Sequence, residues 1–211
     1  MPSTCPKCRR VMEEDSVCCA EVKYTWKCKS CGKLSTGFVV PYGRCFLCGG
    51  ENEVIEGYDG ADADQVGIVR EAMQYELDMY QFYRLALGRA QDATLRQVLE
   101  ELYRKEEDHL QELEEKYHVH LDPQFRELPD QAEKLLSQWI FHGIDFSPAK
   151  DHVLAIYDKA IAMERRTRDY FKARAVLSRS PRQREIYREL AAEEEEHVAI
   201  LETEREQFIA R

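Results

Sequence analysis

The sequence predicts a mainly α fold in which a four-helix bundle follows a small Cys-rich β module. The first observation is the distribution of cysteine, because all eight cysteines lie between Cys5 and Cys48 of the 211 residues. The second is that apolar residues after about residue 60 recur with a helical period over four long stretches. The third is charge, since residues 1–57 hold 8 Lys+Arg and 7 Asp+Glu, whereas residues 58–211 hold 22 and 33. We therefore expect two domains, the module at 1–57 and the bundle at 58–211.

Composition also argues against several classes of protein. The chain has no run of about 18 apolar residues, which a membrane-spanning helix needs, and residues 1–5 do not resemble the start of a secretory signal. We therefore expect a cytoplasmic protein, in whose reducing surroundings paired cysteines bind metal rather than form disulfides. The formal net charge of −10 argues against a duplex-DNA-binding protein. Weak nucleic-acid binding remains a minor alternative because four lysines lie in one stretch of the module, at Lys23, Lys27, Lys29 and Lys33.

The module contains three Cys-x-x-Cys pairs, at Cys5/Cys8, Cys28/Cys31 and Cys45/Cys48, and a Cys18-Cys19 doublet. A two-residue gap lets both sulfurs of a tight turn face one ion, and two such turns complete a tetrahedron. Thirteen residues separate the second pair from the third, and each of these pairs is followed by a glycine that suits a tight turn. This spacing predicts one four-thiolate site formed by Cys28, Cys31, Cys45 and Cys48. Around these pairs, residues 21–26 alternate like a strand and residues 37–41 form a short extended stretch.

The other four cysteines allow three interpretations. Cys5 and Cys8 could form a second site with the doublet. They could instead pair with Cys28 and Cys31, which would leave Cys45 and Cys48 to the doublet. The third interpretation is that one cysteine of the doublet is a small buried apolar residue.

The acidic region predicts four long helices, at about 61–90, 92–117, 147–177 and 180–211. Ser147-Pro148 and Ser180-Pro181 are typical N-cap and first-turn pairs for the last two. The connection over 118–147 is expected to hold a short helix near 129–142. Each long helix has an apolar stripe that should be buried, and each stripe carries ionisable residues in its middle: Glu76, then Glu106 with His109, then Glu164, then Glu194 with His197.

Buried ionisable groups are costly unless they are paired or bound to metal. Here they also repeat: Glu76 and Glu106 are 30 residues apart, as are Glu164 and Glu194, and a shift of 88 residues maps the first set onto the second. Residues three apart share a helix face, so each Glu-x-x-His pair can reach one site. Four carboxylates would balance two divalent cations, and mixed oxygen and imidazole ligands suit iron or manganese. The acidic neighbours should be solvated: Glu107, Asp108, Glu193, Glu195 and Glu196.

This order of ligands over about residues 60–211 resembles the ferritin-like superfamily of di-iron carboxylate proteins. The segment from Trp26 to Cys48 resembles the rubredoxin-like module of rubrerythrins, a pattern that zinc ribbons share. The resemblance implies a ferritin-like four-helix bundle whose iron ligands and catalytic residues are Glu76, Glu106, His109, Glu164, Glu194 and His197. It also implies that Glu106 and Glu194 bridge two irons, that Tyr83, beside the ligands, is a further catalytic residue, and that zinc or iron fills one or two cysteine sites.

The chain departs from rubrerythrins where they carry two further carboxylates, because it has Thr167 and His197 there. The six-ligand set is therefore closer to that of bacterioferritin, although Glu107 stands where bacterioferritin has its haem-ligating methionine. The resemblance implies a di-iron oxidoreductase that reduces peroxide or O₂, as a peroxidase or a ferroxidase. We expect an electron-donor protein as a partner, and a homodimer. The alternatives are a non-catalytic iron-binding or storage protein and a metal- or oxidant-responsive interaction protein.

Overall fold

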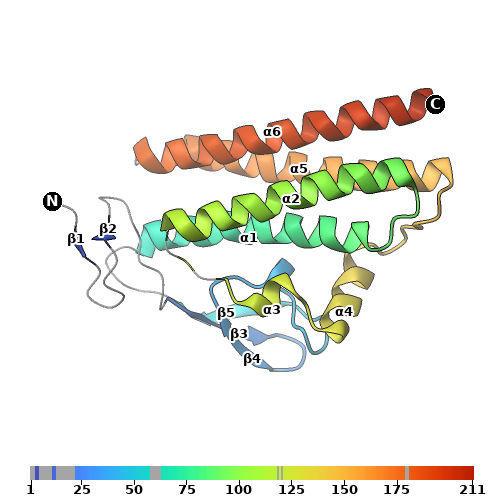
Figure 1. The fold of residues 1–211 in the computed structure, drawn as a ribbon. Coiled ribbons are helices and arrows are strands. Elements are labelled where there is room, and N and C mark those ends of the chain that lie inside the picture. Colours follow the sequence, from blue (N-terminus) through green and yellow to red (C-terminus); the bar gives the residue numbers. More distant parts are fainter. Residues whose placement is uncertain are drawn as a thin grey trace. The chain divides into compact units, whose positions relative to one another are not determined.

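The computed structural model describes residues 3–4, 11–12, 22–57, 63–117, 119, 121–178 and 181–211, and it confirms the predicted fold class. The chain is mainly helical, with a small antiparallel sheet (Figure 1). Four cysteines lie close together in the same module. The four long helices lie close to their expected ranges: α1 (Ala63–Leu87), α2 (Ala93–Tyr117), α5 (Lys150–Leu177) and α6 (Pro181–Ala210).

Two compact units make up the structure. The first contains Met1–Gln81 and Glu106–Ile140, and the second contains Phe82–Lys105 and Phe141–Arg211. Helices α1 and α2 therefore contribute residues to both units. The domain boundary expected near residue 57 stays a prediction.

The sheet of the first unit has the order β4-β3-β5, with both pairings antiparallel. Strand β3 (Tyr24–Cys28) buries alternate side chains, as the sequence pattern predicted, although it lies further along the chain than expected. Strand β4 (Leu34–Gly37) ends where the extended stretch was expected to begin, and β5 (Asn52–Glu56) was not predicted. After β4 the chain turns through a short 3₁₀ helix, η1 (Pro41–Gly43). Two short strands near the N-terminus also pair antiparallel, β1 (Ser3–Thr4) and β2 (Val11–Met12).

The connection between α2 and α5 contains two short helices. Helix α4 (Asp130–Ile140) confirms the short helix predicted there, whereas α3 (Pro123–Arg126) was not predicted. Gln81 of α1 is fully buried, and its side-chain amide donates a hydrogen bond to the carbonyl oxygen of Phe125. Carbonyl groups at the end of a helix lack partners within the helix, so Gln81 stabilises the end of α3.

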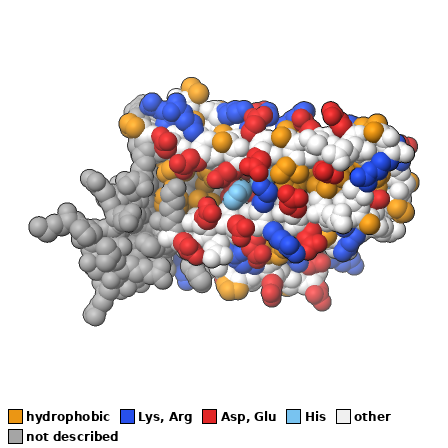
Figure 2. Space-filling model, turned by 45° about the horizontal axis from the view of Figure 1, so that its top comes forward, with side chains coloured by type: hydrophobic (Ala, Val, Ile, Leu, Met, Phe, Trp, Pro, Cys, Tyr) orange, Lys and Arg blue, Asp and Glu red, His pale blue; other side chains and the backbone are white. Residues whose placement is uncertain are grey.

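In the second unit, α5 and α6 run antiparallel, side by side (Figure 1). Acidic and basic side chains are interspersed on the face drawn in Figure 2. Ion pairs join the two helices along their length: Arg165 with Glu202, Lys172 with Glu195, and Arg205 with Asp158. Exposed pairs of this kind are each worth about 0.2–1 kcal/mol, so the buried stripes stabilise the helices more.

The expected N-cap of α5 is wrong. The sequence predicted Ser147-Pro148 as the cap and first turn, but α5 begins at Lys150 after Ala149, which makes no side-chain capping hydrogen bond. Ser147 is engaged in a turn instead. Its N–H donates to Asp145 Oδ1 at 2.8 Å, and its Oγ lies 2.6 Å from His152 Nδ1.

The predicted apolar stripes are confirmed. Most of their residues are buried, and fully burying a large apolar side chain stabilises a protein by roughly 1.5–3 kcal/mol. Leu87 and Phe208, at the ends of their stripes, are only half-buried. The buried members include Val69, Met73, Tyr83, Leu99, Leu102, Tyr157, Phe171, Tyr187 and Leu201. None of the described helices is long and apolar enough to cross a membrane.

Candidate metal centres

Four cysteine sulfurs of the β module lie close enough together to hold one metal ion. The Sγ atoms of Cys28, Cys31, Cys45 and Cys48 are within 4.8 Å of one another. The Sγ of Cys28 is 3.5 Å from that of Cys48, and the Sγ of Cys31 is 3.8 Å from that of Cys45. A tetrahedral ion with metal–sulfur bonds of about 2.3 Å needs sulfur–sulfur distances of about 3.8 Å. The distances therefore fit a four-thiolate site, and they are too long for disulfides, whose sulfurs are about 2.05 Å apart.

The two Cys-x-x-Cys turns have the same backbone geometry. The N–H of Gly32 donates to the Cys28 carbonyl at 2.9 Å, and the N–H of Gly49 donates to the Cys45 carbonyl at 2.8 Å. Both glycines have positive φ angles, of 73° and 72°. Only glycine adopts this conformation readily, which explains why each cysteine pair is followed by one.

Two of the thiols, those of Cys28 and Cys48, have pKa values shifted in opposite directions. Backbone N–H groups of Cys31 and Ser30 donate hydrogen bonds to Cys28 and lower its pKa to about 6, despite the opposing effect of burial. The N–H of Gly50 also lowers the pKa of Cys48, but the neighbouring sulfurs outweigh it and raise that pKa to about 12. A cation would displace the remaining protons, because thiolates rather than thiols are metal ligands.

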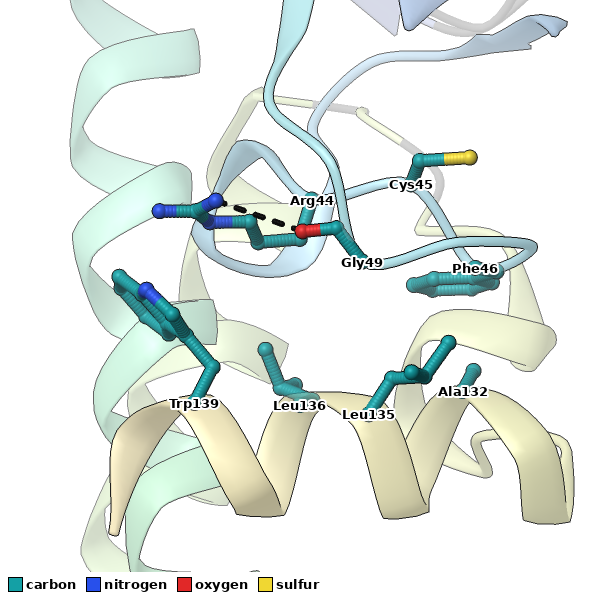
Figure 3. Close-up of a pocket in the computed structure, with 8 residues that line it drawn as sticks. All are labelled: Arg44, Cys45, Phe46, Gly49, Ala132, Leu135, Leu136 and Trp139. Atoms are coloured by element: carbon teal, nitrogen blue, oxygen red, sulfur yellow. Dashed lines mark hydrogen bonds between the residues drawn. The ribbon is translucent and has the colours of Figure 1, made fainter. Parts of the chain in front are cut away.

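The second cysteine turn packs against α4. Figure 3 shows the ring of Phe46 over Leu135 and Ala132 of α4, and Arg44 beside Trp139. The guanidinium carbon of Arg44 lies 4.2 Å from the centroid of a Trp139 ring, and Arg44 Nη1 donates to the carbonyl oxygen of Gly49 at 3.3 Å. The sequence analysis did not predict that Arg44 and Trp139 lie beside the cysteine site. The one feature that could have indicated it is the short amphipathic helix at 130–140, which carries Trp139.

The first carboxylate cluster consists of Glu76 of α1 with Glu106 and His109 of α2. Each of the three offers a ligand atom within 4.8 Å of the other two, and His109 Nδ1 lies 3.2 Å from Glu76 Oε2. Both glutamates are buried, whereas the His109 side chain is 16% exposed. A helical turn places Glu106 and His109 on one face of α2. The cluster could hold a metal ion.

The second carboxylate cluster consists of Glu164 of α5 with Glu194 and His197 of α6. His197 Nδ1 lies 3.6 Å from Glu164 Oε1 and 3.8 Å from Glu194 Oε2. All three side chains are at most 2% exposed. The arrangement repeats that of the first cluster 88 residues later, as the duplicated sequence pattern predicted.

Glu164 also accepts a hydrogen bond from the hydroxyl group of Tyr83. Burial alone would raise the pKa of Glu164, but hydrogen bonds with Glu194, His197 and Tyr83 outweigh burial and lower it. The Tyr83 bond goes to Oε1, whereas the buried Oε2 has no hydrogen-bond partner among the described residues. A buried carboxylate oxygen without a hydrogen-bond partner among the described residues is suited to bind a cation when the carboxylate is ionised.

Burial separates the predicted ligands from their acidic neighbours. Among the four consecutive glutamates at 193–196, only Glu194 is fully buried, at 1% exposure. In the same way, Glu106 is buried, Glu107 is half-buried and Asp108 is exposed. These neighbours were expected to be solvated. Asp108, Glu195 and Glu196 are exposed, and Glu107 and Glu193 are half-buried.

The structure thus groups the ten described ligand candidates into one cysteine cluster and two carboxylate clusters. The other predicted ligands, Cys5, Cys8, Cys18 and Cys19, lie outside the described residues, so a second cysteine site stays a prediction. No model of a protein family matches the sequence, and no curated protein or solved structure matches it either. A functional assignment therefore depends on the residues themselves.

Proposed function

We propose that this protein is a di-iron carboxylate oxidoreductase, similar to rubrerythrins, that reduces peroxide or O₂. The observation that carries the proposal is the pair of Glu-Glu-His clusters, which have the same composition and sequence spacing and whose four glutamates are all buried. Four buried carboxylates are costly to keep in a protein interior unless cations accompany them. Two divalent cations would balance their charge of −4.

In this proposal the two clusters together form one dimetal centre. Glu106 and Glu194 would be the ligands that both ions share, and each of the other four residues would bind one ion. A glutamate from each of two helices and a Glu-x-x-His motif from each of the other two is the ligand set of di-iron carboxylate bundles. The carboxylate and imidazole donors favour iron or manganese over a soft metal.

Two bound iron(II) ions would supply the two electrons that, with two protons, convert hydrogen peroxide into two molecules of water. The residues of the chain position the ligands and handle protons. The Tyr83 hydroxyl holds Glu164 in place through its hydrogen bond to Oε1. His109 keeps 16% of its side chain exposed, so we assign the access of solvent, and of the protons that it supplies, to this side of the site, beside Glu76. Buried neighbours on α1, such as Met73 and Leu77, exclude bulk water from this region.

The four-thiolate site has two possible roles. Iron held by four thiolates can carry single electrons, whereas zinc has no accessible redox step. We propose that the site passes electrons from an external donor protein when it holds iron. When it holds zinc, its role is structural.

Peroxide consumption by the iron-loaded protein tests the proposed function. The protein is loaded anaerobically with two Fe(II) per chain beyond those bound by cysteine, and hydrogen peroxide is then added. We expect two Fe(II) to be oxidised per peroxide, far faster than free Fe(II). Glu194→Gln should abolish the fast oxidation, whereas Glu196→Gln, an exposed neighbour in the same run, should leave it unchanged. Oxidation of loaded wild-type protein at the rate of free iron would contradict the proposal.

Two further results separate the alternatives. Cys45→Ser should stop sustained turnover with an external reductant but spare the first oxidation, if iron fills the thiolate site. An iron-storage protein would instead take up and retain many more than two oxidised irons per chain.

A further inference from the structure

We propose that Tyr42 is a positioning residue that couples metal binding at the four-thiolate site to metal binding at the first carboxylate cluster. The inference rests on the proposed metal binding by Glu76, Glu106 and His109, and it adds a physical link between that cluster and the cysteines. Tyr42 lies in η1, three residues before Cys45. All of the residues in this argument belong to the first unit.

Tyr42 is held on α1 by two hydrogen bonds to one residue. Its backbone N–H donates to Asp78 Oδ1 at 2.5 Å, and its hydroxyl group donates to the Asp78 carbonyl at 2.6 Å. Gln74 reinforces the attachment one helical turn earlier, because its Nε2 donates to Asp78 Oδ1 at 2.8 Å and to the Val40 carbonyl at 2.9 Å. The loop that leads into the second cysteine pair is therefore fixed to a short segment of α1.

The backbone of Tyr42 is strained, which indicates that its position is imposed by its surroundings. Tyr42 has φ 52° and ψ 17°, in the left-handed region that few residues other than glycine occupy. Of the non-glycine residues that the structure describes, it alone has a positive φ. Such a conformation persists only where neighbouring contacts determine it, and the contacts with Asp78 do so here.

The same loop is held by α4 on its other side. The ring of Tyr42 packs edge-on against Trp139, with centroids 5.3 Å apart, and Arg44 lies over the same tryptophan (Figure 3 shows Arg44 and Trp139). Arg44 directly precedes Cys45. Binding of an ion by the four sulfurs holds the two cysteine turns at the spacing that they already have, so it restrains a loop that is anchored to both helices.

Asp78 and Gln74 flank the ligand Glu76 on α1. Residues four apart lie on one face of a helix, whereas Glu76, two residues from each, points about 200° away. The loop therefore contacts one face of α1, whereas Glu76 projects from the opposite face. There Glu76 Oε2 lies 3.2 Å from His109 Nδ1. Because a helix moves as a stiff element, a restraint on the loop at Asp78 also restrains the position of Glu76 relative to His109.

Coupling of this kind is reciprocal, so an ion in either site should strengthen binding at the other by the same factor. Manganese and zinc separate the two sites, since Mn²⁺ prefers carboxylate and imidazole ligands and Zn²⁺ binds thiolates tightly. The full-length protein is stripped with a chelator and titrated with Mn²⁺, followed by the electron paramagnetic resonance of free Mn²⁺. The titration is repeated after Zn²⁺ is added until no free thiol is detected.

In the wild-type protein we expect zinc to raise the affinity for Mn²⁺ about five- to tenfold. In Tyr42→Ala, zinc should change it less than about twofold. Tyr42→Phe should respond partially, because it loses the hydroxyl bond to Asp78 but keeps the ring against Trp139, whereas Tyr42→Ala loses both. The control Tyr103→Ala, which removes a half-buried tyrosine of α2, should respond like the wild type. If Tyr42→Ala does not fold, Asp78→Asn weakens the same link from the α1 side.

The outcomes separate this inference from the proposed function. Absence of any Mn²⁺ binding by the wild-type protein overturns both. Binding that zinc does not strengthen overturns the coupling alone. A zinc response that persists undiminished in Tyr42→Ala and Asp78→Asn overturns the role of Tyr42.

Discussion

The two carboxylate clusters have the same residues at the same spacing, but their surroundings differ. In the first cluster the His109 side chain is 16% exposed, whereas the equivalent His197 is 2% exposed. Tyr83 donates a hydrogen bond to Glu164 of the second cluster. The residue that the 88-residue shift places opposite Tyr83 in the repeat is Phe171, which has no hydroxyl group.

This difference shows which features the two halves of the repeated pattern share. Ligand spacing follows from the helical period and from where each helix begins, so both copies retain it. Solvent access and hydrogen bonds to the ligands depend on single side chains, which diverge independently. We expect the first cluster to exchange protons and ions with solvent more readily, and the second to be the more rigid of the two.

The largest effect should come from removing a proposed bridging glutamate. Glu106→Ala removes one from the first cluster and Glu194→Ala removes one from the second. If both bridge, each variant should lose both non-thiolate ions, with affinity reduced on the order of 100-fold. Metal analysis after gel filtration measures this loss. Retention of one ion by each variant would mean that the clusters are two independent sites, and retention of two would exclude the glutamates as ligands.

A smaller effect should follow from loss of the hydrogen bond that distinguishes the second cluster. Tyr83→Phe should destabilise the metal-free protein at pH 7 by about 1.5–3 kcal/mol, the usual value of a hydrogen bond to a charged group. Denaturant unfolding measures it. Tyr157→Phe is the matched control, because the buried Tyr157 hydroxyl has no hydrogen-bond partner among the described residues. Equal destabilisation by the two variants would contradict a specific role for Tyr83.

The effect of Tyr83→Phe should also depend on pH. The folded state lowers the pKa of Glu164, so ionised Glu164 contributes stability above its unfolded pKa of about 4.3. That contribution is lost as pH falls through the lower folded pKa. The stability difference between wild type and Tyr83→Phe should therefore shrink below about pH 4. A difference that stays constant down to the acid transition would show that the hydroxyl does not act through the carboxylate.

The smallest expected effect is a difference in histidine reactivity. In the metal-free protein, diethyl pyrocarbonate should modify His109 several times faster than His197, since only His109 has appreciable exposure. Peptide mapping by mass spectrometry follows the two residues in one sample. Faster modification of His197 would mean that the second cluster opens more often than the first.

The helices and clusters could be predicted from the sequence because their signals are periodic. Glu194 stood out from Glu193, Glu195 and Glu196 because it continues the apolar stripe of its helix, and it is the buried member of the run. The glycine that follows each of the pairs Cys28/Cys31 and Cys45/Cys48 likewise indicated a tight turn. These features depend only on residues within a few positions of each other.

The attachment of the cysteine loop to α1 and α4 could not be predicted. Gln74 and Asp78 are polar residues on the side of α1 away from the apolar stripe, where periodicity indicates solvent. Their partners, Val40 and Tyr42, lie more than 30 residues away in sequence. The predicted N-cap of α5 was wrong because the Ser147 hydroxyl lies against His152 instead of capping the helix.

The most direct test of the central claim is a count of bound irons by ligand type. Mössbauer spectroscopy of the protein loaded anaerobically with ⁵⁷Fe(II) distinguishes iron held by four sulfurs from iron held by oxygen and nitrogen. We predict two irons per chain with oxygen and nitrogen ligands, and their loss in Glu106→Ala. If all of the bound iron instead has sulfur ligands, the two carboxylate clusters do not form a di-iron centre.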